Sequence, residues 1–362
     1  MGFSCGIIGL PNIGKSTLFN ALTEGQVAAE NYAFCTVAPN HGVAAVPDPR
    51  LAAVAACFSP EKITSTSLEF VDIAGLVKGA AEGEGLGNQF LGQIAAVDAI
   101  AHVVRCFEDD NVTHVHGQVN PVDDVEVVET ELLLRDLELA ESRLEKQLKV
   151  ARGGDKEAKN EVAALEPVVE ALRKGQSLRS LNLDEEQQAC LKATPFLTAK
   201  PILFIANVSE DQLNSFADEA LSSLARARQA ELVIISAAIE AELNDLEPAD
   251  RKDYMAELGL SMRGLDAVVQ AGYALLDLVT FFTTVGTEVR AWTVPKGTIA
   301  PKAAGKIHSD MERGFIRAEV IQAPELISLG SEQAARERGL RRLEGKDYEV
   351  QDGDVIRFRF NV

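Results

Sequence analysis

The sequence predicts an α/β protein in three parts, and three patterns along its 362 residues carry this prediction. Residues 3–8, 99–106 and 201–206 are short, almost unbroken apolar runs, which are typical of buried strands in a mostly parallel sheet. From about Glu126 the apolar residues recur at helical spacing instead. Residues 279–362 again carry strand and turn signals. We therefore expect a parallel-sheet domain, a helical segment and a smaller β-rich unit.

Residues 9–17, GLPNIGKST, follow the first apolar run, precede a helix-like segment and match the pattern G-x-x-x-x-G-K-[ST]. Glycines let such a loop curl so that backbone N–H groups face phosphate oxygens, and the following helix adds its positive dipole end. Lys15 supplies a cation for the outer phosphates, and the Ser16 hydroxyl is an oxygen ligand suited to Mg²⁺. The alternative, a glycine turn before an ordinary helix, is disfavoured by the combined strand, spacing and Gly-Lys-Ser-Thr. The loop predicts a nucleotide site.

Thr36 and Asp72, which follow the loop in the sequence, are further candidate magnesium ligands. Thr36 lies about twenty residues after Ser16, where nucleotide switches place a second hydroxyl ligand, although a lone loop threonine is usually ordinary. Asp72 ends a predicted strand at 67–72 and begins an Asp-x-x-Gly arrangement, in which the aspartate holds Mg²⁺ through water. Both therefore belong to the predicted metal site.

Four glycines in residues 79–87 predict a loop that rearranges at low steric cost, and we interpret it as a second switch. The residue after Gly75 is Leu76, where familiar GTPases carry a glutamine that orients the attacking water. The usual catalyst is therefore missing from this sequence.

Asn207 and Ser236 follow apolar runs, so both lie where ligands bind in open α/β sheets. GTPases carry Asn-Lys-x-Asp at the first of these positions, and the aspartate accepts two hydrogen bonds from guanine. Here Val208 replaces the lysine, and Glu210, one methylene longer, replaces the aspartate. Displacing the carboxylate should relax the base preference or reverse it toward adenine. The alternative is that Asn207 merely caps a helix.

The segments GLPNIGKSTLFN, NYAFCTVAPN and DIAGLVKGA, the Asn-x-x-Glu variant and the C-terminal run resemble the Obg-like ATPases along essentially the whole chain. These form the YchF branch of the translation-factor-related P-loop GTPases. The resemblance implies hydrolysis of ATP in preference to GTP, dependence on Mg²⁺, stimulation by K⁺, and association with the ribosome or its large subunit.

The resemblance also implies the roles of individual residues. It places Asn12, Ile13, Gly14, Lys15, Ser16 and Thr17 on the phosphates, Ser16 and Thr36 on Mg²⁺, and Asn207, Val208 and Ser236 around the base. Asn12 would help to seat potassium. The first switch departs from the family pattern, because Ala33 and Ala38 stand where proline and glutamate are usual.

Because Leu76 cannot position water, hydrolysis in this family is assigned to another group, and the matching residue here is His114. A neutral imidazole that titrates near pH 7 can polarise a water. From the residues alone, a histidine in an acidic loop is more often a solvated surface residue, and His116 is an equal alternative. The choice of His114 as a catalytic residue therefore depends on the resemblance, whereas Lys15 is chosen as a catalytic residue from the phosphate loop itself.

Residues 129–199 predict an antiparallel helical hairpin of coiled-coil type, inserted between two strands of the nucleotide domain, which then comprises residues 1–128 and 200–278. Five basic residues gather within fourteen positions at the expected tip. These are Lys146, Lys149, Arg152, Lys156 and Lys159. Such charges either bind a partner or simply keep an exposed helix soluble, and the pattern leaves both open.

Residues 279–362 resemble the TGS domain, a small β-grasp module found beside P-loop domains in translation-related proteins. From Thr287 onward we count 13 Lys and Arg against 12 Asp and Glu, whereas the preceding residues carry 22 against 43. The C-terminal unit is therefore not acidic, and four of its arginines could face ribosomal RNA or lie on a solvated helix. These are Arg336, Arg338, Arg341 and Arg342.

The formal net charge of −20 opposes indiscriminate nucleic-acid binding, so no DNA partner is expected. No apolar run approaches the roughly 20 residues of a membrane span. The five cysteines are scattered without C-x-x-C spacing, which favours reduced thiols over a zinc site. Together these features predict a cytoplasmic protein, and the resemblance implies that it is an ATPase. The alternatives are a translation-associated GTPase and a ribosome- or RNA-binding regulator whose hydrolysis is incidental.

Overall fold

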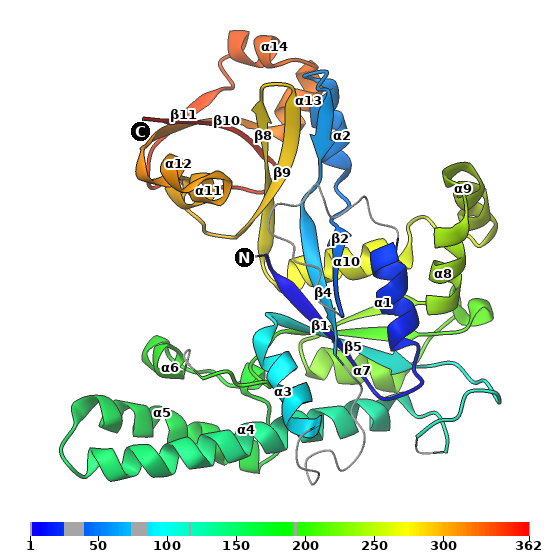
Figure 1. The fold of residues 1–362 in the computed structure, drawn as a ribbon, viewed down its shortest axis with the longest axis vertical. Coiled ribbons are helices and arrows are strands. Elements are labelled where there is room, and N and C mark those ends of the chain that lie inside the picture. Colours follow the sequence, from blue (N-terminus) through cyan, green and yellow to red (C-terminus); the bar gives the residue numbers. More distant parts are fainter. Residues whose placement is uncertain (1, 25–39, 74–85, 116, 192–193, 362) are drawn as a thin grey trace.

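The computed structural model describes residues 2–24, 40–73, 86–115, 117–191 and 194–361. Figure 1 shows a central sheet flanked by helices, a helical hairpin that extends away from it, and a second sheet at the opposite end. Thr36, Leu76 and His116 lie outside the described residues, as do most of the two predicted switches.

The first sheet has six strands in the order β2-β4-β1-β5-β6-β7. Neighbouring strands from β4 to β7 are parallel, and β2 runs antiparallel to β4. Every residue of β5 and β6 is buried, as expected for central strands covered on both faces. The predicted α/β fold with a mostly parallel sheet is confirmed. The strands are β1 Ser4–Ile8, β2 His41–Ala45, β4 Ser67–Asp72, β5 Ala99–Arg105, β6 Ile202–Asn207 and β7 Glu231–Ile235.

Helices pack on both faces of this sheet, and their apolar sides join one core that contains Leu18, Ile94 and Val268. The helices and the short 3₁₀ helix η3 are α1 Lys15–Glu24, α3 Leu86–Ala96, η3 Glu210–Gln212, α7 Glu219–Ala227, α8 Ala237–Asp245, α9 Pro248–Glu257 and α10 Gly264–Leu275.

The helical hairpin consists of α4 (Pro121–Ala151) and α5 (Lys156–Arg173), followed by the 3₁₀ helix η2 (Leu178–Ser180) and α6 (Glu185–Leu191). Asn120 caps α4, and Asp155 caps α5 through its side chain. The predicted helical insertion is confirmed. Its first helix begins at Pro121 rather than near the predicted boundary at 129.

The first part of α4 packs in the core of the first sheet. The side chains of Val125, Val128 and Leu132 on α4 are fully buried in the core of the nucleotide domain. Further along α4, the buried carboxylate of Asp136 accepts hydrogen bonds from the backbone N–H groups of Leu197 (2.8 Å) and Thr198 (2.7 Å) and from the Thr198 hydroxyl (2.6 Å). The root of α4 therefore belongs to the nucleotide domain, while its distal half packs on α5.

A second sheet of six strands, in the order β11-β10-β12-β8-β9-β3, forms the C-terminal unit. Helices α11 and α12 pack with one of its apolar clusters. The prediction of a strand-rich C-terminal unit is confirmed, and its assignment to the TGS type stays a prediction. The elements after residue 277 are β8 Leu278–Val285, β9 Glu288–Pro295, α11 Ala300–Ile307, α12 Ser309–Arg313, β10 Phe315–Gln322, α13 Ala323–Leu329, α14 Glu332–Glu337, β11 Arg342–Glu344 and β12 Asp354–Phe360.

One segment from the N-terminal part joins this second sheet. The segment between β2 and β4 carries α2 (Pro49–Ala56) and β3 (Lys62–Thr64), and β3 pairs in parallel with β9. Leu51 and Val54 of α2 pack with the buried Phe282 of β8. The prediction that residues 1–128 belong to the nucleotide domain does not include this arrangement. A short amphipathic helix does not indicate which sheet covers its apolar face.

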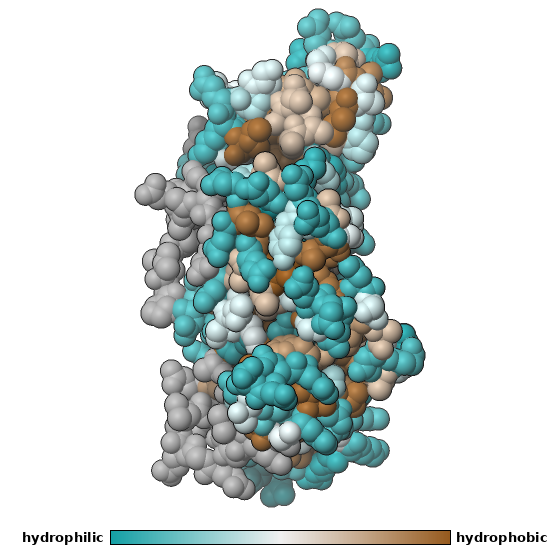
Figure 2. Space-filling model, turned by 90° about the vertical axis from the view of Figure 1, so that its right-hand side faces the viewer, coloured by the Kyte–Doolittle hydropathy of each residue, from teal (hydrophilic) through white to brown (hydrophobic). Residues whose placement is uncertain are grey.

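Figure 2 shows that hydrophilic residues cover much of one face of the molecule and are interrupted by smaller apolar patches. Exposed apolar side chains come from distant parts of the described chain, for example Ile63, Leu134 and Leu343. Single exposed apolar residues of this kind are normal on protein surfaces. None of the described helices combines the length and apolarity needed to cross a membrane.

Candidate functional site

The loop between β1 and α1 has the backbone conformation that its sequence predicts. Gly9 and Gly14 have φ angles of +151° and +86°, and Asn12 has a φ of +62°. A Cβ atom on Gly14 would collide with the side-chain amide of Asn207, so this position requires glycine for space as well as for conformation. The loop then delivers Lys15, Ser16 and Thr17 to the first turn of α1.

This loop borders a cavity of about 550 Å³ at the carboxyl edge of the parallel sheet. Five of the six residues that the resemblance places on phosphates line it. The lining residues are Leu10, Pro11, Asn12, Gly14, Lys15, Ser16, Thr17, Asn40 and Asp72. The sixth predicted residue, Ile13, has its side chain buried in the core. Any contribution of Ile13 to phosphate binding must therefore come from its backbone N–H.

Lys15 and Asp72 form an ion pair across the cavity, in which the Lys15 ammonium contacts Oδ1 of Asp72. Both side chains are mostly buried, with exposed fractions of 10% and 17%. Each group neutralises the other, which limits the cost of holding two charges where little water reaches them. Asp72 ends β4, and Lys15 begins α1, so two different elements aim these charges at one point.

The donor set fits Mg²⁺. The hydroxyl of Ser16 and the carboxylate of Asp72 line the same cavity, and oxygen ligands of these two kinds are those that Mg²⁺ takes alongside phosphates and water. The predicted third ligand, Thr36, lies outside the described residues. Among the described residues there is no group of three or more His, Cys, Asp and Glu side chains able to hold a metal. A magnesium site here would depend on the nucleotide phosphates for its remaining ligands.

Asn207 lies at the end of β6 and is buried. Its side-chain amide donates to the carbonyl oxygen of Ile13 (2.8 Å), and its Oδ1 accepts from the backbone N–H of Ala237 (2.9 Å). Ala237 is the first residue of α8, so Asn207 fastens the phosphate loop to the start of that helix. One N–H and one oxygen lone pair of the amide therefore hold the protein itself together.

The other predicted base-site residues lie beside Asn207 but do not line the cavity as described. Val208 and Ser236 are both 2% exposed, and the N–H of Val208 donates to the carbonyl oxygen of Ile235 (2.8 Å). Glu210 is exposed at the start of η3. The structure therefore brings these residues to the expected edge of the sheet without showing which of them would contact a base.

His114 does not line the cavity either. Its Nε2 lies 2.9 Å from Oδ2 of Asp124 in the first turn of α4, and both side chains are only 4% exposed. The loop that carries His114 nevertheless touches the phosphate loop, because the side chain of Asn12 donates to the carbonyl oxygen of Thr113 (3.2 Å). The predicted catalytic residue is therefore next to the site and turned toward α4.

Sequence reasoning missed three residues that shape the site. Arg105, fully buried at the end of β5, donates to the carbonyl oxygens of Phe107 (3.1 Å) and Val112 (2.9 Å) and so folds the loop before His114. Asn40, with a φ of +67°, lines the cavity, and its carbonyl accepts from the Asp72 N–H. The third is Asp124. A charged residue that ends an otherwise apolar strand was the available signal for Arg105.

Other titratable groups near β5 are unsuited to chemistry. Burial raises the pKa of the Cys5 and Cys106 thiols to about 12, so neither forms the reactive thiolate near neutral pH. Burial lowers the pKa of His102, in the middle of β5, to about 3. His102 is therefore a neutral core residue, unlike the partnered His114 at the edge of the sheet.

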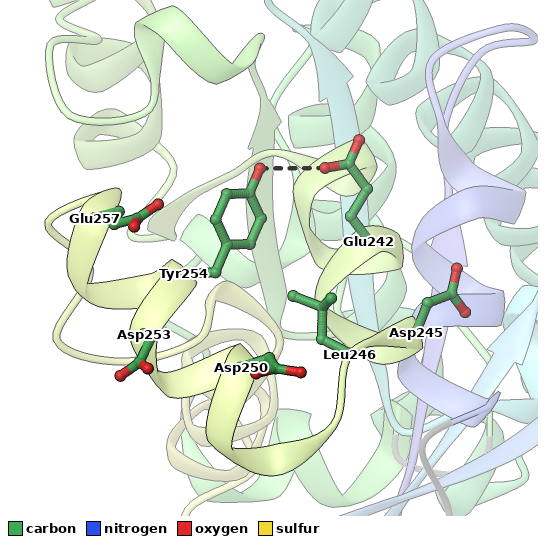
Figure 3. Close-up of a pocket in the computed structure, with 7 residues that line it drawn as sticks. All are labelled: Glu242, Asp245, Leu246, Asp250, Asp253, Tyr254 and Glu257. Atoms are coloured by element: carbon green, nitrogen blue, oxygen red, sulfur yellow. Dashed lines mark hydrogen bonds between the residues drawn. The ribbon is translucent and has the colours of Figure 1, made fainter.

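A second cavity, of about 580 Å³, lies between α8 and α9 (Figure 3). Tyr254 and Leu246 line it together with five carboxylates, and the Tyr254 hydroxyl donates to Glu242 (3.2 Å). The acidic residues are Glu242, Asp245, Asp250, Asp253 and Glu257. So many negative charges repel phosphate, and the nucleotide site is therefore the cavity at the glycine loop.

Two family models match the chain. Residues 4–135 match the family described as 50S ribosome-binding GTPase, and residues 278–361 match the family YchF-GTPase_C, described as a protein of unknown function. The first match contains the phosphate loop, Asp72 and His114. The second begins with β8.

Curated relatives align with the chain from end to end. The protein named ribosome-binding ATPase YchF from Escherichia coli O157:H7 is 52% identical over 364 residues, and that from Bacillus subtilis strain 168 is 49% identical over 366 residues, with 100% of both chains covered in each case. A solved structure described as the Schizosaccharomyces pombe YchF GTPase has a TM-score of 0.89 and 33% identity, covering 99% of this chain and 98% of that one. The relatives are thus named ATPases, whereas the solved structure is described as a GTPase.

Proposed function

The chain belongs to the YchF family, and from this premise we propose that it is a magnesium-dependent ATPase that associates with the ribosome or its large subunit. The curated relatives carry both activities in their name, ribosome-binding ATPase. The observation that supports nucleotide hydrolysis most strongly in this chain is the cavity in which the phosphate loop, Lys15, Ser16 and Asp72 meet.

The chemistry follows from what these residues can do. Backbone N–H groups of the loop and the N-terminus of α1 would hold the phosphate oxygens, and Lys15 would leave Asp72 to neutralise the outer phosphates. Ser16 and Asp72, with Thr36, would hold Mg²⁺, which when bound balances negative charge that develops on the phosphates. Such a site works by positioning and charge neutralisation, and this suits a slow switch.

Adenine is the proposed base. A carboxylate placed as in a GTPase rewards guanine by accepting two hydrogen bonds, whereas adenine offers a lone pair on that edge. Glu210 is exposed and one methylene longer than aspartate, and Val208 replaces the usual lysine. Asn207 uses one N–H on the loop and one oxygen lone pair on α8. These features support a site that no longer favours guanine.

His114 is the proposed group that activates water, and Asn12 is proposed to help seat a stimulating potassium ion. Because His114 is buried against Asp124, it would have to turn away from α4 to reach the phosphates. Asn12 has a left-handed backbone and an exposed side chain at the mouth of the cavity, which is compatible with a cation bound beside the phosphates.

One equilibrium titration tests the nucleotide part of the proposal. ATP and GTP are titrated separately into the full chain by calorimetry, with Mg²⁺ and with either K⁺ or Na⁺ as the monovalent salt. We expect tighter binding of ATP than of GTP. A separate phosphate-release assay in the same buffers should be faster in K⁺ than in Na⁺. Tight GTP binding with ATP excluded would instead favour the alternative of a translation-associated GTPase.

Ribosome association needs a basic surface on this acidic protein, and the C-terminal unit has one. Five arginines surround only two glutamates on β10, β12 and the segment around α14, and we call them the arginine cluster. Its members are Arg317, Arg336, Arg341, Arg357 and Arg359, and the two acids are Glu319 and Glu332. The cluster therefore carries an excess of three positive charges.

The arginines of the cluster share two carboxylates and also face one another. Arg317 of β10 lies directly opposite Arg359 of β12, and like charges in such a pair destabilise a sheet. Burial and then repulsion from Arg357 and Arg359 lower the pKa of Arg341. Phosphates of ribosomal RNA would relieve this repulsion, so we propose the cluster as an RNA contact of the C-terminal, TGS-like unit.

The basic residues predicted at the hairpin tip support a second contact less strongly. All five are exposed around the turn between α4 and α5, but Lys149 already pairs with Glu145 (2.8 Å). A ribosome partner implies that the protein works in the cytoplasm, which we include in the proposal.

Sedimentation with purified ribosomes tests this part. At about 0.1 M salt we expect the full chain to pellet with ribosomes, and the Arg317→Ala/Arg359→Ala variant to bind at least roughly fivefold more weakly with a shallower salt dependence. Arg226→Ala, which removes an exposed arginine of α7 paired with Glu219, is the matched control and should bind normally. Equal binding of the double variant would contradict the RNA contact. Binding that persists unchanged with or without ATP would favour a ribosome-binding regulator with incidental hydrolysis.

A further inference from the structure

We propose that Asp124 is a positioning residue for hydrolysis, which holds His114 against α4 and away from the phosphate cavity until nucleotide is bound. This inference rests on the proposed role of His114 in water activation. It goes further, because it names the group that restrains the histidine and predicts that the restraint limits the rate.

The contact between His114 and Asp124 is buried, and Asp124 lies on a fixed turn of α4. The 2.9 Å contact between His114 Nε2 and Asp124 Oδ2 is shielded from water, since each side chain is 4% exposed. A carboxylate in the first turn of a helix is stabilised by the helix dipole, and Asp124 lies in the first turn of α4. Val125, the next residue, is fully buried in the core of the nucleotide domain and fixes the position of this turn. Asp124 therefore offers His114 a rigid partner.

The loop that carries His114 is held beside the phosphate loop by hydrogen bonds to its backbone. Asn12 holds the carbonyl of Thr113, so the backbone beside His114 already touches the phosphate loop. Just before this point the loop is also fixed by Arg105, which donates to the carbonyl oxygens of Phe107 and Val112. Both anchors precede His114, and turning its side chain from α4 toward the cavity requires that the contact with Asp124 be broken.

The loop offers nucleotide a direct way to break this contact. Asn12 lines the cavity, so a bound phosphate oxygen would compete for the Asn12 side-chain N–H that now donates to Thr113. Loss of that hydrogen bond would loosen the backbone next to His114. The buried pair with Asp124 would still restrain the histidine, and its strength would limit the fraction of molecules in which His114 can act on water.

The decisive variant is Asp124→Asn, which keeps the shape of the side chain and removes its charge. If Asp124 restrains His114, kcat for ATP should rise about three- to tenfold with KM nearly unchanged, because a larger fraction of molecules has the histidine free. Asp124→Glu, which restores a carboxylate, should bring kcat back toward the original value. Asp123→Asn is the matched control, since Asp123 lies in the same turn but is exposed and bonded to Asn120, and kcat should not change.

A second measurement does not depend on a variant that folds. Amide hydrogen exchange in peptides covering residues 112–126 should increase in the unaltered chain when a non-hydrolysable ATP analogue and Mg²⁺ are added. The same peptides should exchange faster in Asp124→Asn without nucleotide. Exchange that is unaffected by the analogue contradicts the restraint, even if Asp124→Asn proves unstable.

The outcomes separate this inference from the proposed function. If His114→Ala lowers kcat but Asp124→Asn also lowers it, Asp124 orients the imidazole for catalysis and the restraint is wrong. If His114→Ala leaves kcat unchanged, the catalytic assignment of His114 fails, and the restraint fails with it. Support requires that Asp124→Asn raise kcat and that the gain disappear in the His114→Ala/Asp124→Asn double variant.

Discussion

The phosphate half and the base half of the nucleotide site differ in how their polar groups are used. On the phosphate side, Lys15, Ser16 and Asp72 line an open cavity, and the Lys15–Asp72 pair can exchange one partner for a ligand. On the base side, Asn207 is buried, and its amide binds Ile13 and Ala237 at both ends. One half is prepared for a ligand, whereas the other mainly holds the first half in place.

This difference shows where affinity and specificity can arise. Phosphates are common to all nucleoside triphosphates, so the open half contributes binding strength without distinguishing the base. Discrimination must come from groups on the base side, and Asn207 has only one N–H and one lone pair left over from its bonds to Ile13 and Ala237. The proposed preference for adenine would therefore have to come from the base side alone.

Replacing Lys15 should have the largest effect. Lys15→Ala removes the cation that is proposed to face the outer phosphates, and it leaves Asp72 without the partner that Lys15 provides. Removal of one such charge from a preorganised site lowers kcat by about 100- to 1,000-fold. Phosphate release at saturating ATP measures this effect, and calorimetry should show ATP and GTP weakened alike. Lys252→Ala, at an exposed position on α9, is the control. A kcat within threefold of the original would contradict the role of the open half.

The fold could be predicted because its signals are local. Unbroken apolar runs give β5 and β6, and the glycine pattern gives the loop between β1 and α1. The attachment of α2 and β3 to the C-terminal sheet could not be predicted, since an eight-residue helix and a three-residue strand carry no information about a partner more than 200 positions away. Short elements take their place from tertiary packing rather than from propensity.

The candidate site was predictable to the same limited extent. Lys15, Ser16 and Asp72 follow from spacing, because a short loop and a strand end fix where these side chains go. The partner of His114 does not follow, since it depends on how the first turn of α4 lies beside a loop with no regular structure. Arg105 and Asn40 were missed for the same reason: their contacts are made by loop backbone, for which the sequence has no periodic signal.

Asn207→Ala should have a smaller effect, of a different kind, and tests the other half of the comparison. The substitution leaves the carbonyl of Ile13 and the N–H of Ala237 without their partner in a buried place, so the free energy of unfolding should fall by about 2–4 kcal/mol. Affinity for ATP and GTP should fall together, with their ratio unchanged, because the phosphate loop loosens while no base contact is lost. Denaturant unfolding measures the free energy of unfolding, and paired titrations measure the two affinities.

Asn214→Ala is the control, since it removes one exposed hydrogen bond to the carbonyl of Leu258 (2.7 Å). It should lower the free energy of unfolding by less than about 1 kcal/mol. A stable Asn207→Ala protein with an altered ATP to GTP ratio would show that Asn207 reads the base, and that both halves of the site are open to the ligand.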